Sequence, residues 1–270
     1  MALSLDYYLK SLASSYYLKN DSTENTRITA SVSNLVKNLK EDMNPLINRI
    51  FIFGSYDRDT ILPRSIDENS DIDVMVVFNH TEHERTPETY RIWLKLFADK
   101  YYKNRYGSEV VKSFPTVTVK LNNIIYDLVP AKEEHFFYRA SVISIPSKVS
   151  GWQETDPNDI KSKLTIANTQ YNGIVRPIIR LLKAWNASNG YPFDSYDLEL
   201  QITNMNFFND TVQTGFFWAV RMLSYSWGDS QNKQNKIASL QFNVQKAIDA
   251  LEANNLDLAK NWLHRVLPKP

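Results

Sequence analysis

Hydrophobic positions near the start of the chain repeat with the spacing of α-helices. Tyrosines and leucines dominate residues 3–19, which predicts a first helix. After the candidate capping residues Asp21 and Ser22, apolar side chains recur every three or four positions, and this predicts a second helix that ends before Pro45. The apolar positions of this second segment are Ile28, Val32, Leu35, Val36 and Leu39.

The pattern then changes to that of β-strands. Residues 48–53 and 72–78 are short, apolar and rich in β-branched side chains, which is typical of buried strands. A helix is predicted over residues 87–106, between these two strands and the strands that follow. A further strand is expected to run from His135 to Ile145.

Residues 116–121 and 124–129 predict a β-hairpin closed by Asn122 and Asn123, because asparagine tolerates the positive φ of a tight turn. A two-residue turn places Thr118 opposite Asp127. Both then lie on the polar face of the hairpin, together with Thr116 and Lys120. The other face is apolar and carries Val117, Val119, Leu121, Tyr126 and Leu128.

The second half of the chain has the pattern of helices. Asp156 followed by Pro157 is a typical helix start, and helical spacing continues to Leu267 with breaks at Gly173, Gly190 and Gly228. We therefore expect an α+β protein with two lobes. Residues 1–155 form a lobe with a mixed sheet and the N-terminal helices, and residues 156–270 form a helical lobe that closes a cleft against it.

Three aspartates provide the candidate chemistry. Asp71 and Asp73 are two positions apart on a predicted strand, so both side chains point to the same face. Asp127 lies within a later apolar strand, where aspartate is disfavoured. Carboxylates are the ligands that Mg²⁺ prefers, and such a set can hold a pair of ions for phosphoryl or nucleotidyl transfer. The alternative is that these acids are surface charges at strand ends.

Gly54 and Ser55 follow the first predicted strand and precede the acids. Glycine lets the backbone turn sharply and approach a phosphate closely, and serine adds a hydroxyl and a backbone N–H. If a short helix follows, its N-terminus faces the anion. Together with the acids, this turn predicts the active site of a nucleotidyltransferase, with two Mg²⁺ ions, or Mn²⁺ in their place, on Asp71, Asp73 and Asp127.

Two further polar segments are expected to be solvated. The loop between the turn and the acids carries Asp57, Asp59, Asp67 and Glu68. His80-x-x-His83 has the spacing of a metal-chelating pair, but no third ligand accompanies it, so a solvated loop is the favoured interpretation.

The chain resembles the polymerase-β-like nucleotidyltransferases through Gly54-Ser55 with Thr60, Ser70-Asp-x-Asp73 and Asp127. Its second half is similar to the bacterial cyclic GMP-AMP synthase-like and DncV-like enzymes (CD-NTases) of anti-phage CBASS systems. That likeness rests on Trp152, Thr155-Asp-Pro157, Arg180-Leu-Leu-Lys-Ala-Trp185, Ser195-Tyr196 and Glu199.

The resemblance implies roles for three residues of the helical lobe. Lys183 and Ser195 would contact the triphosphate of a bound nucleotide, and Tyr196 would stack on its base. The alternatives are a surface charge for Lys183, a helix N-cap for Ser195 and core packing for Tyr196. The chain departs from the family at Asp59, where a glycine is usual before Thr60.

The family makes cyclic di- or trinucleotides from ATP and a second nucleoside triphosphate, and a downstream effector protein reads the product. A linear oligonucleotide or tRNA-end nucleotidyltransferase is the alternative enzyme, and a catalytically silent nucleotide-binding regulator is the alternative of another class. Lys and Arg total 31 against 30 Asp and Glu, and this near-neutral balance disfavours a long nucleic-acid partner. The first twenty residues do not read as a signal peptide and no long apolar run occurs, so a cytoplasmic protein without a membrane partner is expected.

Overall fold

The computed structural model describes residues 3–19, 23–138, 140–149 and 151–269. The chain forms two compact units. We call the first, Asp21–Asp59 with Asn69–Asp159, the sheet unit. We call the second the helical unit, and it comprises Met1–Asn20, Thr60–Glu68 and Ile160–Pro270. The division into lobes of residues 1–155 and 156–270, which the sequence analysis gave, stays a prediction.

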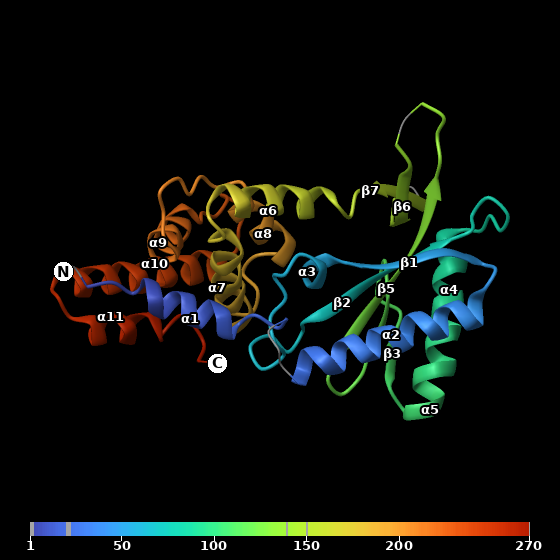
Figure 1. Ribbon diagram of the computed structural model, residues 1–270, viewed down its shortest axis with the longest axis horizontal. Coiled ribbons are helices and arrows are strands. Elements are labelled where there is room, and N and C mark those ends of the chain that lie inside the picture. Colours follow the sequence, from blue (N-terminus) through green and yellow to red (C-terminus); the bar gives the residue numbers. More distant parts are fainter. Residues whose placement is uncertain (1–2, 20–22, 139, 150, 270) are drawn as a thin grey trace. The chain divides into compact units, whose positions relative to one another are not determined.

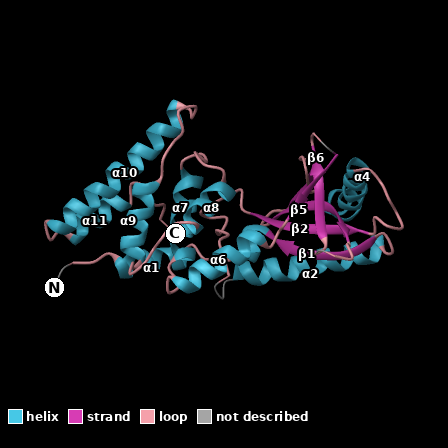
Figure 2. Ribbon diagram, turned by 90° about the horizontal axis from the view of Figure 1, so that it is seen from above, coloured by secondary structure: helices cyan, strands magenta, loops and turns pink. Residues whose placement is uncertain are grey.

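Within the described residues, the strands of the sheet unit form one seven-stranded mixed sheet (Figures 1 and 2). The order is β1-β2-β5-β4-β3, and β6 pairs with both β5 and β7. The β2–β5 pair is parallel and the other pairs are antiparallel. The strands are β1 (Ile47–Phe53), β2 (Asp71–Phe78), β3 (Glu109–Val111), β4 (Val117–Lys120), β5 (Ile125–Glu134), β6 (Val142–Ser147) and β7 (Gly151–Thr155).

Two long helical segments pack on one face of this sheet. Helix α2 (Thr23–Met43) is joined to it by the Tyr126 hydroxyl, which donates to Ser31 Oγ at 2.6 Å. Helix α4 (Pro87–Ala98) stacks Tyr90 on Phe78 with ring centroids 4.2 Å apart. The register pairs Ile72 with Tyr126, so Phe78 and Tyr126 lie on the same face. The opposite face of the sheet carries the candidate acids Asp71, Asp73 and Asp127.

Most elements of the sheet unit confirm the sequence predictions. Residues 87–106 are helical throughout, although the α-helix passes through a π-helical turn at Asp99–Lys103 before α5 (Asn104–Tyr106). The hairpin register is confirmed, because Thr118 pairs with Asp127 and the Leu121 N–H donates to the Ile124 carbonyl at 2.8 Å. The proposed caps Asp21 and Ser22 lie outside the described residues.

The prediction for residues 135–145 is wrong in its bounds. Strand β5 continues to Glu134, and β6 begins only at Val142. The prediction missed β7, which follows the β6 turn and pairs with β6 at the sheet edge. The Asp156-Pro157 start is also displaced: Asp156 Oδ1 accepts from the Asn158 N–H at 2.9 Å in a turn, and α6 begins at Asp159.

The helical unit packs its helices around α7, ten of whose residues are buried. Its core includes Trp185 and a close contact between α7 and α9, where an added Cβ at Gly215 would lie 2.7 Å from Ile178 Cδ1. The predicted breaks at Gly173, Gly190 and Gly228 all fall between helices. The helices are α1 (Asp6–Ser15), α6 (Asp159–Gln170), α7 (Val175–Ser188), α8 (Ser195–Thr203), α9 (Val212–Met222), α10 (Gln231–Glu252) and α11 (Leu256–Leu263).

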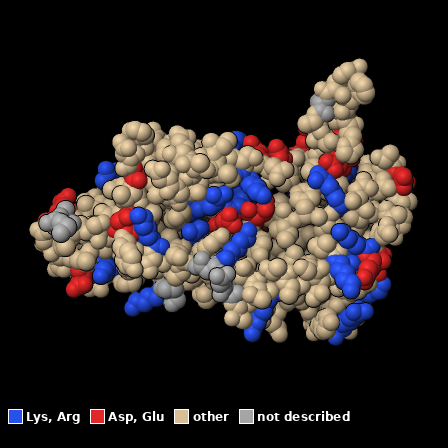
Figure 3. Space-filling model, in the orientation of Figure 1, with Lys and Arg blue, Asp and Glu red and all other residues tan. Residues whose placement is uncertain are grey.

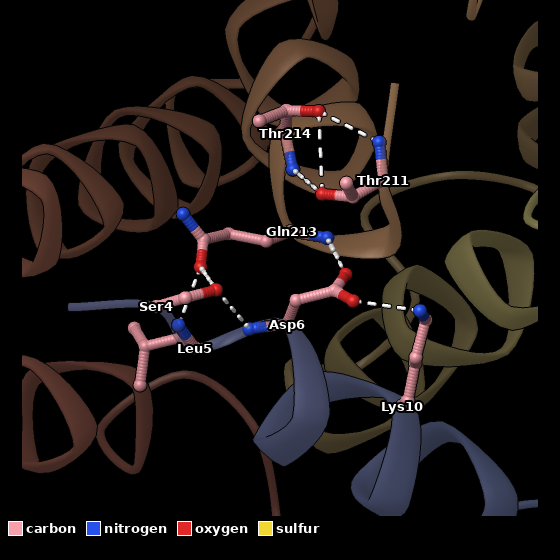
Figure 4. Close-up of polar contacts among 7 residues, drawn as sticks. All are labelled: Ser4, Leu5, Asp6, Lys10, Thr211, Gln213 and Thr214. Carbon is pink, nitrogen blue, oxygen red and sulfur yellow. Dashed lines mark hydrogen bonds and ion pairs between the residues drawn. The ribbon is translucent and has the colours of Figure 1, made fainter. Parts of the chain in front are cut away.

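Polar contacts hold α1 to α9 although the two helices are far apart in sequence (Figure 4). The Gln213 N–H donates to Asp6 Oδ1 at 3.1 Å, and Gln213 Oε1 accepts from the Leu5 N–H at 2.5 Å. Lys10 forms an ion pair with Asp6 at 2.7 Å. Burial raises the pKa of Asp6, but the hydrogen bonds from Lys10 and Gln213 outweigh it and leave this pKa below its ordinary value.

Candidate active site

Asp71, Asp73 and Asp127 come together on adjacent parallel strands. Asp73 on β2 pairs directly with Asp127 on β5, and Asp71 lies two positions earlier on β2. One carboxylate oxygen from each residue lies within 4.8 Å of the others, and all three side chains are half-buried. Among the described residues, this is the one group of at least three His, Asp or Glu side chains close enough to hold a metal ion.

The donor set fits a divalent cation. Three anionic oxygen ligands converge from one face of a rigid sheet, and hard cations such as Mg²⁺ prefer such ligands. Like charges held this close repel one another, so a bound cation would stabilise their arrangement. The residues that could hold the metal are therefore the three predicted from the sequence.

Thr118 orients one of these carboxylates. Its hydroxyl donates to Asp127 Oδ1 at 2.5 Å from the neighbouring strand β4, and the Thr118 side chain is buried. This bond restrains the orientation of the Asp127 carboxylate. Sequence reasoning placed Thr118 opposite Asp127 but did not assign it this function.

The glycine of the predicted phosphate turn lies directly against the acids. Gly54 begins the single-turn helix α3 (Gly54–Asp57), which follows β1, and its φ is +72°. A Cβ at this position would lie 1.8 Å from Asp73 Oδ2. Glycine is therefore required twice, for a left-handed backbone and for the space that the Asp73 carboxylate occupies. Ser55 is the next residue of this turn, and its contact with a phosphate stays a prediction.

Lys183, Ser195 and Tyr196 belong to the helical unit. Lys183 is 7% exposed, so the alternative of a surface charge is wrong. Ser195 is the first residue of α8, and the N-cap is Asp194, whose side chain accepts from the Tyr196 N–H at 2.8 Å. Tyr196 is 48% exposed, so the core-packing alternative is also wrong. The nucleotide contacts of all three residues stay predictions.

Two expectations of solvated loops need correction. Asp67 is buried and accepts a hydrogen bond from the Tyr191 hydroxyl at 2.5 Å. His80 packs against Trp152 and lies 2.9 Å, through Nδ1, from the hydroxyl of Tyr90. Burial, followed by the charge of Lys132, lowers the pKa of His80. His80 and His83 join no metal-binding group in the part of the chain that the structure describes.

Comparison with solved structures identifies the class of fold. The structure of CdnG, a CD-NTase from Bradyrhizobium diazoefficiens solved with GTP, superposes with a TM-score of 0.69 at 10% identity, covering 98% of this chain and 99% of that one. CdnC from Escherichia coli MS115-1, solved with ATP, gives 0.68 at 16% identity and covers 98% of both chains. DncV from Vibrio cholerae gives 0.66 at 12% identity, covering 100% and 82%. These likenesses confirm the predicted polymerase-β-like nucleotidyltransferase fold.

Sequence comparison then gives the family. The Second Messenger Oligonucleotide or Dinucleotide Synthetase domain matches residues 3–168, and the chain belongs to this family. A probable cyclic nucleotide synthase from Bacillus cereus is 28% identical over 165 residues, which is 56% of this chain and 50% of that protein. The CBASS oligonucleotide cyclase CdnC from Escherichia coli is 26% identical over 194 residues, 66% and 57% of the two chains. The chain thus spans little more than half of the curated relatives it matches.

Proposed function

We propose that this protein joins nucleoside triphosphates into a cyclic di- or trinucleotide and releases pyrophosphate. The convergence of Asp71, Asp73 and Asp127 beside Gly54 carries the proposal, because this arrangement can bind cations and a triphosphate at one place. Curated relatives named as a cyclic nucleotide synthase and an oligonucleotide cyclase support the cyclic product.

In the proposed reaction, a ribose hydroxyl of one nucleotide attacks the α-phosphorus of another. A phosphodiester bond forms, the bond between the α- and β-phosphates breaks, and the hydroxyl loses its proton. The same step closes the ring when the free hydroxyl of the linear product attacks its own triphosphate end. Asp71, Asp73 and Asp127 would hold the metal ions, Mg²⁺ or Mn²⁺. When bound, these ions favour ionisation of the attacking hydroxyl and stabilise charge on the leaving pyrophosphate.

The remaining residues bind and orient the nucleotide. The turn at Gly54 and Ser55 would carry the phosphates past the Asp73 carboxylate, and Lys183 and Ser195 would contact the triphosphate. Tyr196 offers an exposed ring, and stacking a base on such a ring contributes about 1–3 kcal/mol. The Thr118 hydrogen bond keeps Asp127 in the orientation that the metal site needs.

The substrates and product define the expected partners. Two structural neighbours were solved with GTP and with ATP, and we propose ATP with a second nucleoside triphosphate for this chain. Figure 3 shows basic and acidic side chains interspersed on the face drawn, in agreement with the net charge of +1. We propose that the product acts on an effector protein in the cytoplasm. No described helix combines the length and the apolar character that crossing a bilayer requires.

Incubation with labelled triphosphates and Mg²⁺ tests the proposal. A product that resists phosphatase has no free terminal phosphate and supports cyclisation, and mass spectrometry identifies its bases. A ladder of phosphatase-sensitive products would instead indicate a linear oligonucleotide synthase. Binding of triphosphates without release of pyrophosphate, with either Mg²⁺ or Mn²⁺, would indicate a silent regulator.

A further inference from the structure

A buried carboxylate in the helical unit connects two segments that sequence reasoning associates with the triphosphate. Glu199 on α8 and Thr60 are fully buried, and Lys183 on α7 is nearly so. One oxygen of Glu199, Oε1, accepts a hydrogen bond from the Thr60 hydroxyl at 2.9 Å. The other, Oε2, lies 3.9 Å from the Lys183 ammonium. Glu199 therefore faces Thr60 with one oxygen and Lys183 with the other.

The backbone around Glu199 is firmly held. Asn186 on α7 clamps the loop between α7 and α8, because its side chain donates to the Phe193 carbonyl at 2.9 Å and accepts from the Phe193 N–H at 3.0 Å. The Asp194 side chain then caps α8. In addition, the Thr203 hydroxyl donates to the Glu199 carbonyl at 2.7 Å. These bonds fix the place of Glu199 relative to α7 before any ligand binds.

The charges explain why this residue matters. Burying a lone ammonium or a lone carboxylate is strongly unfavourable, so each compensates the other. At 3.9 Å the ammonium is attracted to Glu199, but the distance is too long for a hydrogen bond. Glu199 thus keeps Lys183 in place without occupying its N–H donors, which suits a side chain that must still donate to an anion.

We propose that Glu199 is a positioning residue for nucleotide binding, which holds the Lys183 ammonium toward the triphosphate and anchors Thr60 immediately after the phosphate turn. The inference rests on the proposed function, because it assumes that Lys183 contacts a triphosphate. Glu199 does not touch the nucleotide. It acts through Lys183 and Thr60.

Glu199→Gln isolates the charge from the shape. Glutamine has the same size and retains an oxygen that can accept from Thr60, but it presents an uncharged amide to Lys183. We expect the KM for the triphosphate, and its Kd measured by calorimetry, to rise roughly tenfold while kcat changes little. Glu199→Asp keeps the charge and should restore most of the affinity. Glu252→Gln, an exposed change in the same unit, is the matched control and should bind as the wild type does.

A double-mutant cycle shows whether Glu199 acts through Lys183. Lys183→Met alone should weaken triphosphate binding, and adding Glu199→Gln to it should weaken binding no further, because the group that Glu199 positions is gone. Additive losses would overturn the proposal. If Glu199→Gln alone does not fold, as a thermal melt would show, Lys183→Met is compared with Lys183→Met combined with Glu199→Gln, in which no buried charge is left without its partner.

The outcomes separate this inference from the proposed function. A wild-type protein that releases no pyrophosphate and binds no triphosphate would overturn both. A wild-type enzyme that makes the cyclic product, with an unchanged KM in the folded Glu199→Gln variant, would overturn the role of Glu199 alone. A raised KM that Glu199→Asp restores would support it.

Discussion

The sheet unit and the helical unit treat buried charge in opposite ways. On β2 and β5, three carboxylates of the same sign are held within 4.8 Å of one another. On α7 and α8, a carboxylate and an ammonium of opposite sign lie 3.9 Å apart and are almost completely buried. The first arrangement brings like charges together, and a bound cation would stabilise it, whereas the second pairs opposite charges. The comparison suggests that the acids serve binding at the expense of stability, and that the ion pair serves stability as well as position.

Removing the acids should have the largest effect on activity. Asp71→Asn with Asp73→Asn is expected to abolish turnover, because losing the metal site removes several kcal/mol of transition-state stabilisation and about 1.4 kcal/mol corresponds to a factor of ten in rate. Asp257→Asn, an exposed change on α11, is the control. Retained turnover would refute the site.

Stability measurements sharpen the contrast. Glu199→Gln should lower the free energy of unfolding by about 1–3 kcal/mol, because Lys183 is left buried without its counter-charge. Mn²⁺ should raise the melting temperature of the wild type but not that of the Asp71/Asp73 variant, since only the former binds the ion. If the Asp71/Asp73 variant and Glu199→Gln lowered the free energy of unfolding equally, the distinction between the two units would be wrong.

Gly54→Ala is the next largest test, and it acts on the acids without changing their charge. The new methyl group would collide with Asp73 Oδ2. Alanine would also have to adopt the left-handed backbone conformation that glycine tolerates at this position. We expect turnover to fall at least a hundredfold and stability to fall by about 2 kcal/mol or more. Gly107→Ala is a matched control, because Gly107 has φ +68° but nothing within 4 Å of its added Cβ. Equal losses in the two variants would mean that strain alone is responsible.

Thr118→Val should have a moderate effect on the same site. Valine keeps the shape but cannot donate to Asp127 Oδ1, so the carboxylate loses the bond that fixes its orientation. We expect kcat to fall roughly tenfold with a small change in KM. Thr118→Ser keeps the hydroxyl and should retain activity. A loss as large in serine as in valine would show that packing, not the hydrogen bond, explains the result.

The faces on which the acids lie could be predicted because those steps depended on local pattern. The Asn122-Asn123 turn fixed the hairpin register, and the register fixed which face Asp127 occupies, as the Thr118–Asp127 pair confirms. The spacing of Asp71 and Asp73 fixed their common face. Parallel pairing of β2 with β5 then brought Asp73 beside Asp127, which is a tertiary fact that the local pattern did not contain.

The helical unit was less predictable for a physical reason. The segment around Glu199 contains polar residues at several helical positions, and nothing local distinguishes the buried acid from the exposed Asp197 two positions earlier. Its burial depends on Thr60 and Lys183, which are remote in sequence. Strand β7 was missed for a similar reason, since its residues form a strand through pairing at the sheet edge with β6.

Asp6→Asn tests an ordinary structural carboxylate of the helical unit, and its effect should be smaller. The substitution removes the ion pair with Lys10 and weakens the link from α1 to α9, so stability should fall by about 1 kcal/mol at neutral pH. Because the pKa of Asp6 is lowered on folding, its contribution is present above the ordinary value of 3.8 and is lost as pH falls through the lower folded pKa. Chemical denaturation at several pH values should show the difference shrinking in acid. A difference that persists at low pH would contradict this account.

The smallest effect is expected at Asp59, where the sheet unit passes into Thr60 of the helical unit along the chain. Its φ is +64°, which explains why a glycine suits this position in the family and why aspartate, more tolerant of the left-handed region than most residues, can replace it. Asp59→Asn keeps that tolerance and removes the negative charge beside the phosphate turn. We expect the KM for the triphosphate to fall about twofold with an unchanged melting temperature. Asp59→Ala, as the control for backbone strain, should instead lower the melting temperature. A higher KM in Asp59→Asn would mean that this acid assists nucleotide binding. Asp59 would then be a fourth acid of the site, in addition to the three aspartates on β2 and β5.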